Sequence, residues 1–404
     1  MDLVRVGERI RRERERVGYS QRQLADLAKL SQSTLNRIEL GTRSNVTLAE
    51  IDRIATSLQI PLRLITSGNP VRERVQIAAR INALVEADRE EALRQSLAIL
   101  ELDARLDKIG SAASDERRQQ RRPAGVTLPS EVDPPERQGK VLATAVRTAL
   151  DLGTAPIADL DELIEQLTGV DTAVIQLPDT VDGFTLTDPV RDMTLIVVRA
   201  CDVPERQRFT FGHELGHLLL GDGADEHQIG DGNTPAEARS NAFARHLLAP
   251  EDGIRSWLAT QSQSAGLESW ACDEREVALL ARHFRVSFSV ILIQLERMRV
   301  ISASRKESMK GPTGVQLAQR YGWGPAYEKE QVAANIVRPP RRILERATLA
   351  YRENRIGVRA LAALEGRPVA ETEAALKEAG ILPTPPTTRR ADLGLLLSHG
   401  SAGR

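Results

Sequence analysis

The apolar positions of this chain recur mostly at helical spacing, in runs that short polar segments separate. In residues 1–68 the runs are brief, and the first predicted helix ends near Val17, just before a glycine. The segments 20–23 (SQRQ) and 47–50 (TLAE) have the pattern of capping boxes, in which side chains satisfy the open amide groups at a helix start. These features predict a small domain of four or five helices over residues 1–68.

A longer helical period follows in residues 69–110, where charged residues lie densely between the apolar ones. The heptad repeat is imperfect, so this helical linker is either a dimerising coiled-coil stalk or a helical hairpin. Residues 111–139 are polar, charged and rich in proline, which predicts a flexible linker. The helical apolar positions of residues 69–110 are Val75, Ile81, Leu84, Leu93, Leu97, Leu100 and Leu106.

Residues 140–300 return to regular structure of mixed type. One helix and a Leu-rich helix at residues 159–167 precede two β-like runs, at residues 172–177 and 193–200, and helices follow. Residues 301–404 are predicted to be a helical C-terminal region with a loose tail after Pro383. The predicted fold class is therefore mainly α, and α+β overall.

The amphipathic helices predicted between residues 315 and 382 are open to several interpretations. They would form a second helix-turn-helix, an interaction module, a dimer interface, or a completion of the preceding core. The last two are favoured, because the surface residues supply no set of ligands. Five arginines of this region are expected to form a solvated face, namely Arg341, Arg342, Arg346, Arg352 and Arg355.

Residues 21–40 have the pattern of a helix-turn-helix, in which two short helices pack through small and apolar residues. The second helix begins near Ser31 and would present polar side chains from its outer, N-terminal face. Side chains of these types reach base edges and phosphates in a major groove. The candidate DNA-binding residues are Gln21, Arg22, Gln32, Ser33, Thr34, Arg37 and Arg43.

Charge modifies this picture. The whole chain has a formal net charge of −1, which taken alone argues against a nucleic-acid binder. Residues 1–68, however, hold 12 basic against 8 acidic residues, so the average conceals a positive head. The alternative for this segment is a small helical bundle that serves a protein interaction.

The segment FGHELGH, residues 211–217, contains the motif HExxH. On a helix, His213 and His217 project from one face because they lie four residues apart, so both imidazoles can bind one zinc ion. Glu214 would flank the open coordination position and act as general base toward water. Gly212 and Gly216 are poor helix formers, which predicts a closely packed neighbour beside this helix.

A third metal ligand is expected on a second helix, which begins near Glu237, 20 residues after His217. Asn241 falls on the same helical face as Glu237 and could steady a ligand through a hydrogen bond. Two further histidines, His227 and His246, could stabilise an oxyanion, but ordinary surface or core roles are favoured for both.

Composition excludes several classes of protein. The chain has two cysteines, too few for a disulfide framework or a four-thiolate metal site. No apolar stretch approaches the ~20 residues that a membrane span needs, and the N-terminal sequence lacks the apolar core of a signal peptide. We therefore expect a cytoplasmic protein without a membrane partner.

Two family resemblances join these observations. With its ending RIELGTR, the segment 3–65 resembles the Cro/XRE (lambda-repressor-like) family, although Lys29 stands where that family usually has glycine. The segments FTFGHELGHLLLG and EARSNAFARHLLAP, within residues 140–300, resemble the ImmA/IrrE zinc metallopeptidases, with Ser240 in the usual alanine place. This second resemblance implies a small zincin-like α+β domain in which His213, His217 and Glu237 bind Zn²⁺ and Glu214 is the catalytic base.

The resemblances imply a function. We expect a transcriptional regulator that binds an operator in double-stranded DNA as a homodimer and carries a zinc-dependent endopeptidase. Its substrate would be a repressor or the chain itself, in a stress or mobile-element response, and the linker at residues 111–139 is a plausible cleavage segment. The alternatives are an antitoxin or ligand-responsive repressor whose peptidase-like domain binds without cleaving, and a housekeeping protease recruited to DNA.

Overall fold

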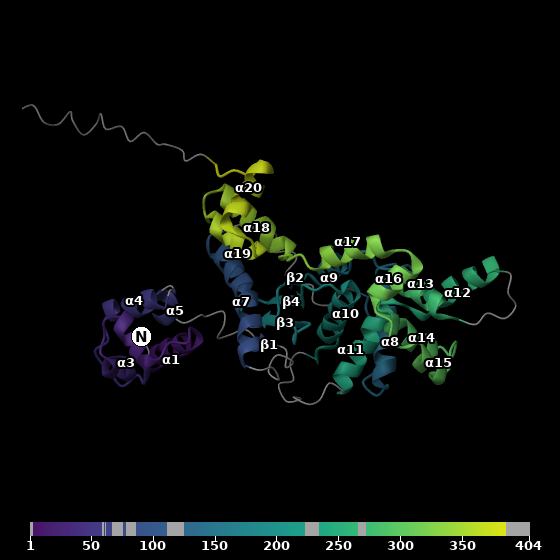
Figure 1. The fold of residues 1–404 in the computed structure, drawn as a ribbon, viewed down its shortest axis with the longest axis horizontal. Coiled ribbons are helices and arrows are strands. Elements are labelled where there is room, and N and C mark those ends of the chain that lie inside the picture. The colour runs from purple at the N-terminus through teal and green to yellow at the C-terminus, as the bar shows by residue number, and fades with distance from the viewer. Residues whose placement is uncertain are drawn as a thin grey trace, which may run out of the picture. The chain divides into compact units, whose positions relative to one another are not determined.

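The computed structural model describes residues 3–58, 60, 62–66, 76–77, 86–110, 125–222, 234–265 and 272–384. Helices predominate, with a small sheet in the middle of the chain, which confirms the predicted fold class (Figure 1). The chain divides into two compact units, Met1–Gln76 with Thr187–Arg191, and Ile77–Leu186 with Asp192–Arg404. Within the described ranges, no helix has both the length and the apolar character needed to cross a membrane.

The first unit contains the predicted bundle of short helices. Both predicted capping boxes form, at Ser20 and at Thr47, so each helix start has its amide groups satisfied. Lys29 adopts a left-handed backbone conformation with φ of 54°, which explains why the Cro/XRE family usually has glycine there. The helices are α1 (Leu3–Arg16), α2 (Gln21–Leu27), α3 (Gln32–Glu39), α4 (Leu48–Ser57) and α5 (Leu62–Thr66).

A buried ion pair holds α1 to α3. Arg14 Nε donates to Glu39 Oε1 at 2.7 Å, and its second terminal nitrogen donates to Oε2 at 3.0 Å. This two-point geometry fixes the orientation of both side chains. Nearby, the backbones approach so closely that a Cβ on Gly7 would stand 2.3 Å from the carbonyl oxygen of Ile38. The bundle is therefore a tightly fixed platform for α3.

The sheet has the strand order β1-β3-β4-β2, and β2, β4 and most of β3 belong to the second unit. β2 and β4 are parallel, with Thr172 opposite Ile196, and they correspond to the two predicted β-like runs. β3 was not predicted from the sequence. The strands are β1 (Gln76–Ile77), β2 (Asp171–Ile175), β3 (Gly183–Asp188) and β4 (Met193–Arg199).

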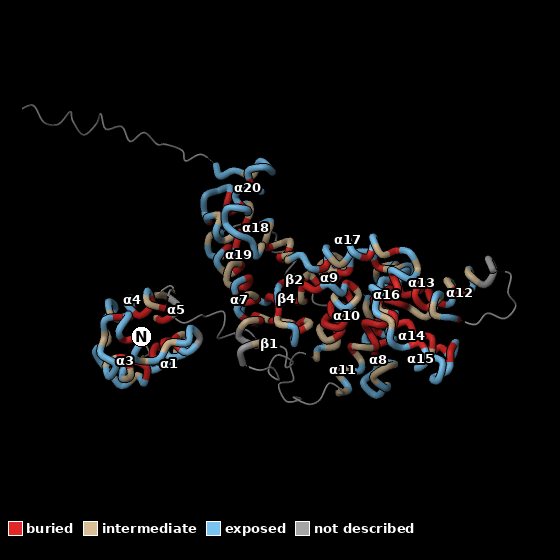
Figure 2. Tube along the Cα trace, in the orientation of Figure 1, coloured by how far each residue is buried: buried red, intermediate tan, exposed pale blue. Residues whose placement is uncertain are grey.

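Helices pack around this sheet and share one continuous apolar core. α10 contacts β4 on one side and α11 on the other, and α11 in turn packs on α8. Figure 2 shows the buried positions along α10 and the strands. The helices of this core are α8 (Pro135–Ala149), α9 (Leu160–Thr168), α10 (Pro204–Leu220), α11 (Pro235–Leu248), α12 (Glu251–Ala265), α13 (Glu274–Phe284) and α14 (Phe288–Arg297).

The predicted linker at residues 111–139 needs a correction at its end. α8 begins at Pro135 and so includes the last five residues of the predicted linker, with proline in the first helical turn. A Cβ on Gly139 would stand 2.4 Å from the carbonyl oxygen of Arg239 and 2.5 Å from the backbone nitrogen of Phe243. A polar, proline-rich composition hid this contact, since glycine carries no apolar signal. Residues 111–124 lie outside the described residues.

The C-terminal region divides between two roles. α15 (Ala303–Met309), α16 (Gly314–Tyr321) and α17 (Gly324–Ala334) add Met309, Leu317 and Trp323 to the core of the sheet and its helices. This outcome agrees with the favoured expectation that these helices complete the core. α18 (Arg341–Arg352) and α19 (Val358–Glu365) instead pack on α7 (Glu86–Lys108), and α20 (Val369–Glu378) packs on α19.

Ion pairs connect α7 and α18. Asp103 of α7, fully buried, accepts from Arg342 at 3.0 Å and also pairs with Arg346. Arg342 reaches Asp171 at the start of β2 as well. The expectation of a solvated arginine face was therefore wrong for these two residues, because buried carboxylates on a distant segment hold them. The buried apolar residues of α7 belong to a helix that packs on α18 and α19 of the same chain.

Candidate metal centre and nucleic-acid interface

Two adjacent helices carry the predicted metal ligands. α10 presents His213 and His217 from one face, one helical turn apart, and His213 is only 3% exposed. Glu237 lies in the first turn of α11, where the Thr234 side chain accepts a hydrogen bond from its backbone amide and starts the helix. The two helices are in direct contact, so the ligands from both meet at their interface.

The three side chains converge on one point. Nε2 of His213 and Nε2 of His217 are 2.9 Å apart. The carboxylate oxygens of Glu237 lie 3.4 Å from the first nitrogen and 3.3 Å from the second. Two imidazoles and one carboxylate form a donor set that suits zinc, and three protein ligands leave one of the four positions of a tetrahedral zinc ion for water or substrate. The residues present therefore fit a divalent metal.

Each histidine is oriented through its other ring nitrogen. Nδ1 of His213 lies 3.0 Å from Oδ1 of Asn241, the residue predicted for this task. Nδ1 of His217 lies 3.3 Å from Oδ2 of Asp222, and Arg239 of α11 donates hydrogen bonds to both carboxylate oxygens of Asp222. Such partners fix the ring and leave Nε2 to face the metal. Sequence reasoning missed Asp222 and Arg239, since neither belongs to a spaced motif and they meet only in the folded chain.

The electrostatic surroundings of the centre favour positive charge. Burial lowers the pKa of His217, but hydrogen bonds to Asp222 and Glu237 and the charge of Glu214 outweigh it and raise the pKa to about 9. The same three carboxylates that favour a protonated imidazole also favour a bound cation. The negative electrostatic potential at this centre therefore favours a bound cation, as the three donor groups do.

Glu214 lies beside the ligands and is 1% exposed. Its Oε2 accepts a hydrogen bond from Oγ1 of Thr185 on β3, at 2.9 Å. The sheet thus reaches the centre from the side opposite α11. Sequence reasoning missed Thr185 together with its strand, although Phe184 and Leu186 alternate with it in the period that is typical of a strand.

The packing expected for the helical glycines is present. A Cβ on Gly216 would stand 3.0 Å from Phe243 and 3.2 Å from Ser240, and one on Gly212 would stand 3.3 Å from Ala244. All three neighbours belong to α11. The two glycines therefore set the separation between α10 and α11, and with it the distance between the histidines and Glu237.

The predicted DNA-binding residues occupy different environments on the first unit. Arg22, Gln32, Ser33 and Arg37 are exposed, on α2 and along α3. Ser33 Oγ nevertheless lies 3.0 Å from Ser31 Oγ, and the three less exposed residues also have partners within the domain. Gln21 donates to Glu39 at 2.8 Å, Thr34 Oγ1 lies 2.8 Å from Ser31 Oγ, and Arg43 pairs with Glu50 at 2.9 Å. The four exposed residues are therefore the part of the predicted DNA-binding set that is open to solvent.

Comparisons with known proteins agree with both parts of this description. Residues 10–65 match the family model described as helix-turn-helix, and residues 169–296 match the model described as IrrE N-terminal-like domain. The chain joins these two modules. A radiation response metalloprotease IrrE from Deinococcus radiodurans is 30% identical over 201 residues, which are 46% of this chain and 57% of that protein.

A solved structure was also found among the comparisons. The chain is similar to Bacillus thuringiensis PlcR in complex with the peptide PapR7 and DNA, at 13% identity, with 82% of this chain and 99% of that chain covered. The TM-score is 0.16. The chain spans just over half of the length of the metalloprotease relative.

His246 of the IrrE-like module lies away from the metal ligands in a buried polar network. Its Nε2 is 3.1 Å from Oε1 of Glu136 on α8, and its Nδ1 is 3.3 Å from the amide nitrogen of Gln294 on α14. Arg245 also donates to Glu136. His246 therefore ties three helices together, which is the ordinary core role that was favoured. His227 lies outside the described residues.

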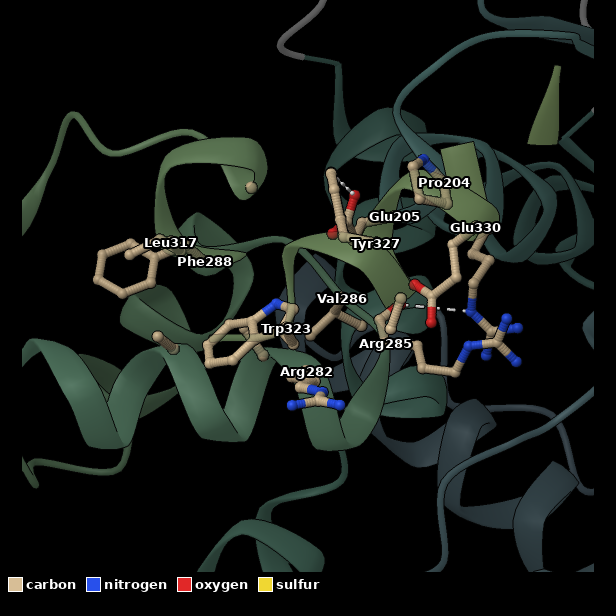
Figure 3. A pocket seen from close by; sticks show the side chains of 15 residues that line it. Pro204, Glu205, Arg282, Arg285, Val286, Phe288, Leu317, Trp323, Tyr327 and Glu330 are labelled. Atoms are coloured by element: carbon tan, nitrogen blue, oxygen red, sulfur yellow. Dashed lines mark hydrogen bonds between the residues drawn. The ribbon is translucent and has the colours of Figure 1, made fainter. Parts of the chain in front are cut away.

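A small cavity of about 40 Å³ lies at the start of α10, bounded by α13, α16 and α17 (Figure 3). Tyr327 donates to Glu205 at 3.0 Å inside it, and burial raises the pKa of Glu205. Trp323 forms another wall, with Arg282 over its ring. A volume of this size holds a few water molecules. None of the metal ligands borders it.

Proposed function

We propose that this chain is a DNA-binding transcriptional regulator whose IrrE-like module is a zinc-dependent endopeptidase. The observation that carries the proposal is the convergence of His213, His217 and Glu237, with the buried carboxylate of Glu214 beside them. A fold kept only for sensing would not need a carboxylate held at this position. The matched family model and the IrrE relative support the same assignment.

The residues divide the chemistry between them. A zinc ion held by the two imidazoles and Glu237 would polarise the scissile carbonyl and acidify the attacking water. Glu214 accepts a proton from that water and passes it to the departing amine, so one water is consumed for each peptide bond broken. Asn241 and Asp222 keep the imidazoles oriented throughout.

The substrate is proposed to be a protein. We propose a repressor, or this chain itself, as the target in a stress or mobile-element response. The relative's printed name describes a radiation response metalloprotease, which supports the stress response. For self-cleavage, the polar part of the predicted linker that precedes α8, residues 111–134, has the composition that proteases prefer. We place this activity in the cytoplasm.

The helix-turn-helix module is proposed to bind double-stranded operator DNA as a homodimer. Arg37 is an exposed cation on α3, and Gln32 and Ser33 are exposed at the start of that helix. Replacing Arg37 with alanine should weaken operator binding by about fivefold to 150-fold, because a lost base contact costs on the order of 1–3 kcal/mol. Unchanged binding in a mobility-shift assay would remove Arg37 from the interface.

The peptidase is tested by comparing zinc-loaded wild type with Glu214→Gln. We expect wild type to produce defined fragments of an unfolded protein substrate, or of itself, and Glu214→Gln to bind zinc equally well and produce none. Glu162→Gln, a matched change on α9 at a partly exposed carboxylate outside the centre, should cleave like wild type. If zinc-loaded wild type cleaves nothing and still binds DNA, the module binds without catalysis.

A further inference from the structure

β3 contacts α10 at two positions, Gly183 against Thr210 and Thr185 against Glu214. A Cβ on Gly183 would stand 2.6 Å from Cγ2 of Thr210 and 2.8 Å from the carbonyl oxygen of Val197. Any other residue at this position would push the strand away from the helix and from β4. Gly183 therefore sets a close approach between β3 and the helix that carries the HExxH motif.

The next contact lies one repeat further along both elements. Two residues of a strand span about 6.7 Å, and four residues of a helix span about 6 Å, so the two repeats nearly match. Two residues beyond Gly183 is Thr185, and four residues beyond Thr210 is Glu214. These two side chains meet, with Oγ1 of Thr185 donating to Oε2 of Glu214 at 2.9 Å.

We propose that Thr185 is a positioning residue for Glu214, a role that rests on the proposed peptidase function. Its hydroxyl donates a hydrogen bond to Oε2 and so restricts the orientation of the Glu214 carboxylate beside the metal ligands. The hydroxyl is anchored by the strand, and the strand is anchored by Gly183 against Thr210. The sheet thus orients the carboxylate of Glu214, while residues of α11 orient the metal ligands.

The chain offers a matched comparison elsewhere in the same sheet. Oγ1 of Thr172 on β2 donates to Oε1 of Glu165 at 2.6 Å, which is also a hydrogen bond from a strand threonine to a helix glutamate. Glu165 lies on α9 and belongs to no part of the metal centre. Replacing Thr172 with valine therefore removes a bond of the same chemistry without touching Glu214.

The test compares Thr185→Val, Thr185→Ser and Thr172→Val as zinc-loaded proteins. A catalytic group displaced by about 1 Å costs on the order of 100-fold in rate, so we expect Thr185→Val to lower kcat by tenfold to a hundredfold. KM and zinc stoichiometry should remain within twofold of wild type. Thr185→Ser keeps the hydroxyl and should restore most of kcat, and Thr172→Val should leave kcat unchanged.

A second measurement does not depend on activity. In the metal-free proteins, the side-chain carboxyl ¹³C resonance of Glu214, assigned by its loss in Glu214→Gln, should shift in Thr185→Val. It should stay in place in Thr185→Ser and in Thr172→Val. This readout follows the hydrogen bond itself, which a purely structural role for Thr185 in the sheet would not affect.

The outcomes separate the two proposals. If wild type cleaves and Thr185→Val keeps its kcat, or Thr185→Ser loses as much as Thr185→Val, the positioning role is overturned while the peptidase stands. A loss of zinc together with kcat would also overturn it, since the residue would then serve assembly of the centre. An inactive zinc-loaded wild type overturns the peptidase, and the positioning role with it.

Discussion

Asp222 gives the most informative single substitution, because it joins the two helices of the metal centre without binding the metal. Its side chain is only 3% exposed, its Oδ2 lies 3.3 Å from Nδ1 of His217, and Arg239 of α11 donates to it at 3.0 Å. Asp222→Asn keeps the shape and removes the charge. Arg239 then loses its ion pair, and the ring of His217 loses an anionic acceptor.

The size of the effect follows from the role of such partners. Removing a group that orients a metal-binding histidine typically costs tenfold to a hundredfold in metal affinity, or about 1.4–2.7 kcal/mol. We therefore expect the zinc Kd of Asp222→Asn, measured by competition with a chromogenic chelator, to rise by that factor. The fold should persist, because the apolar core around α10 is unchanged.

The control is Asp179→Asn, which removes the charge of a fully exposed carboxylate that pairs with Arg199 in the same module. Exposed pairs contribute about 0–1 kcal/mol, and this one lies outside the centre, so zinc affinity should equal that of wild type. A zinc Kd for Asp222→Asn that matches the control would refute the argument that Asp222 orients His217.

Three further outcomes are expected. Gly139→Ala should destabilise the chain by about 2 kcal/mol or more in urea unfolding, since its Cβ would meet the backbone of α11; an unchanged midpoint would contradict the close packing of α8. Asp103→Ala should cost about 3–5 kcal/mol, because Arg342 and Arg346 lose a buried shared carboxylate; a cost below about 1 kcal/mol would show that water replaces it. Burial raises the pKa of Glu136, but hydrogen bonds from His246 and Arg245 outweigh it and hold the pKa at about 2, below its ordinary 4.5. Its stabilisation is therefore complete above pH 4.5 and lost as the pH falls toward 2, so wild type should lose stability more steeply over that range than Glu136→Gln; parallel acid-unfolding curves would contradict the shift.

The sequence was most informative where chemistry and spacing coincide. HExxH needs only helical geometry to bring two imidazoles together, and a second helix with a carboxylate in its first turn supplies Glu237. The capping boxes of the first unit were equally readable, because a cap depends on residues three apart. Local patterns of this kind do not require knowledge of the tertiary fold.

Contacts between distant segments were not readable in the same way. Thr185 and Glu214 are 29 residues apart, and Arg346 and Asp103 are 243 residues apart, so no local period relates them. β3 was overlooked because its alternation is short, with Phe184 and Leu186 as its two large apolar residues. The start of α8 was overlooked because its residues are polar and include proline and glycine, which is the composition of a linker. Gly139 packs closely on α11 because it has no side chain, and no apolar pattern indicates such a contact.

The central claim is that the buried carboxylate beside the His213, His217 and Glu237 centre performs peptide hydrolysis. The most direct measurement is the rate of fragment formation by zinc-loaded wild type and by zinc-loaded Glu214→Gln at equal metal content. We expect cleavage by wild type and a loss of at least a hundredfold in the variant, which is the usual contribution of a general base. Equal rates in the two proteins would contradict the account.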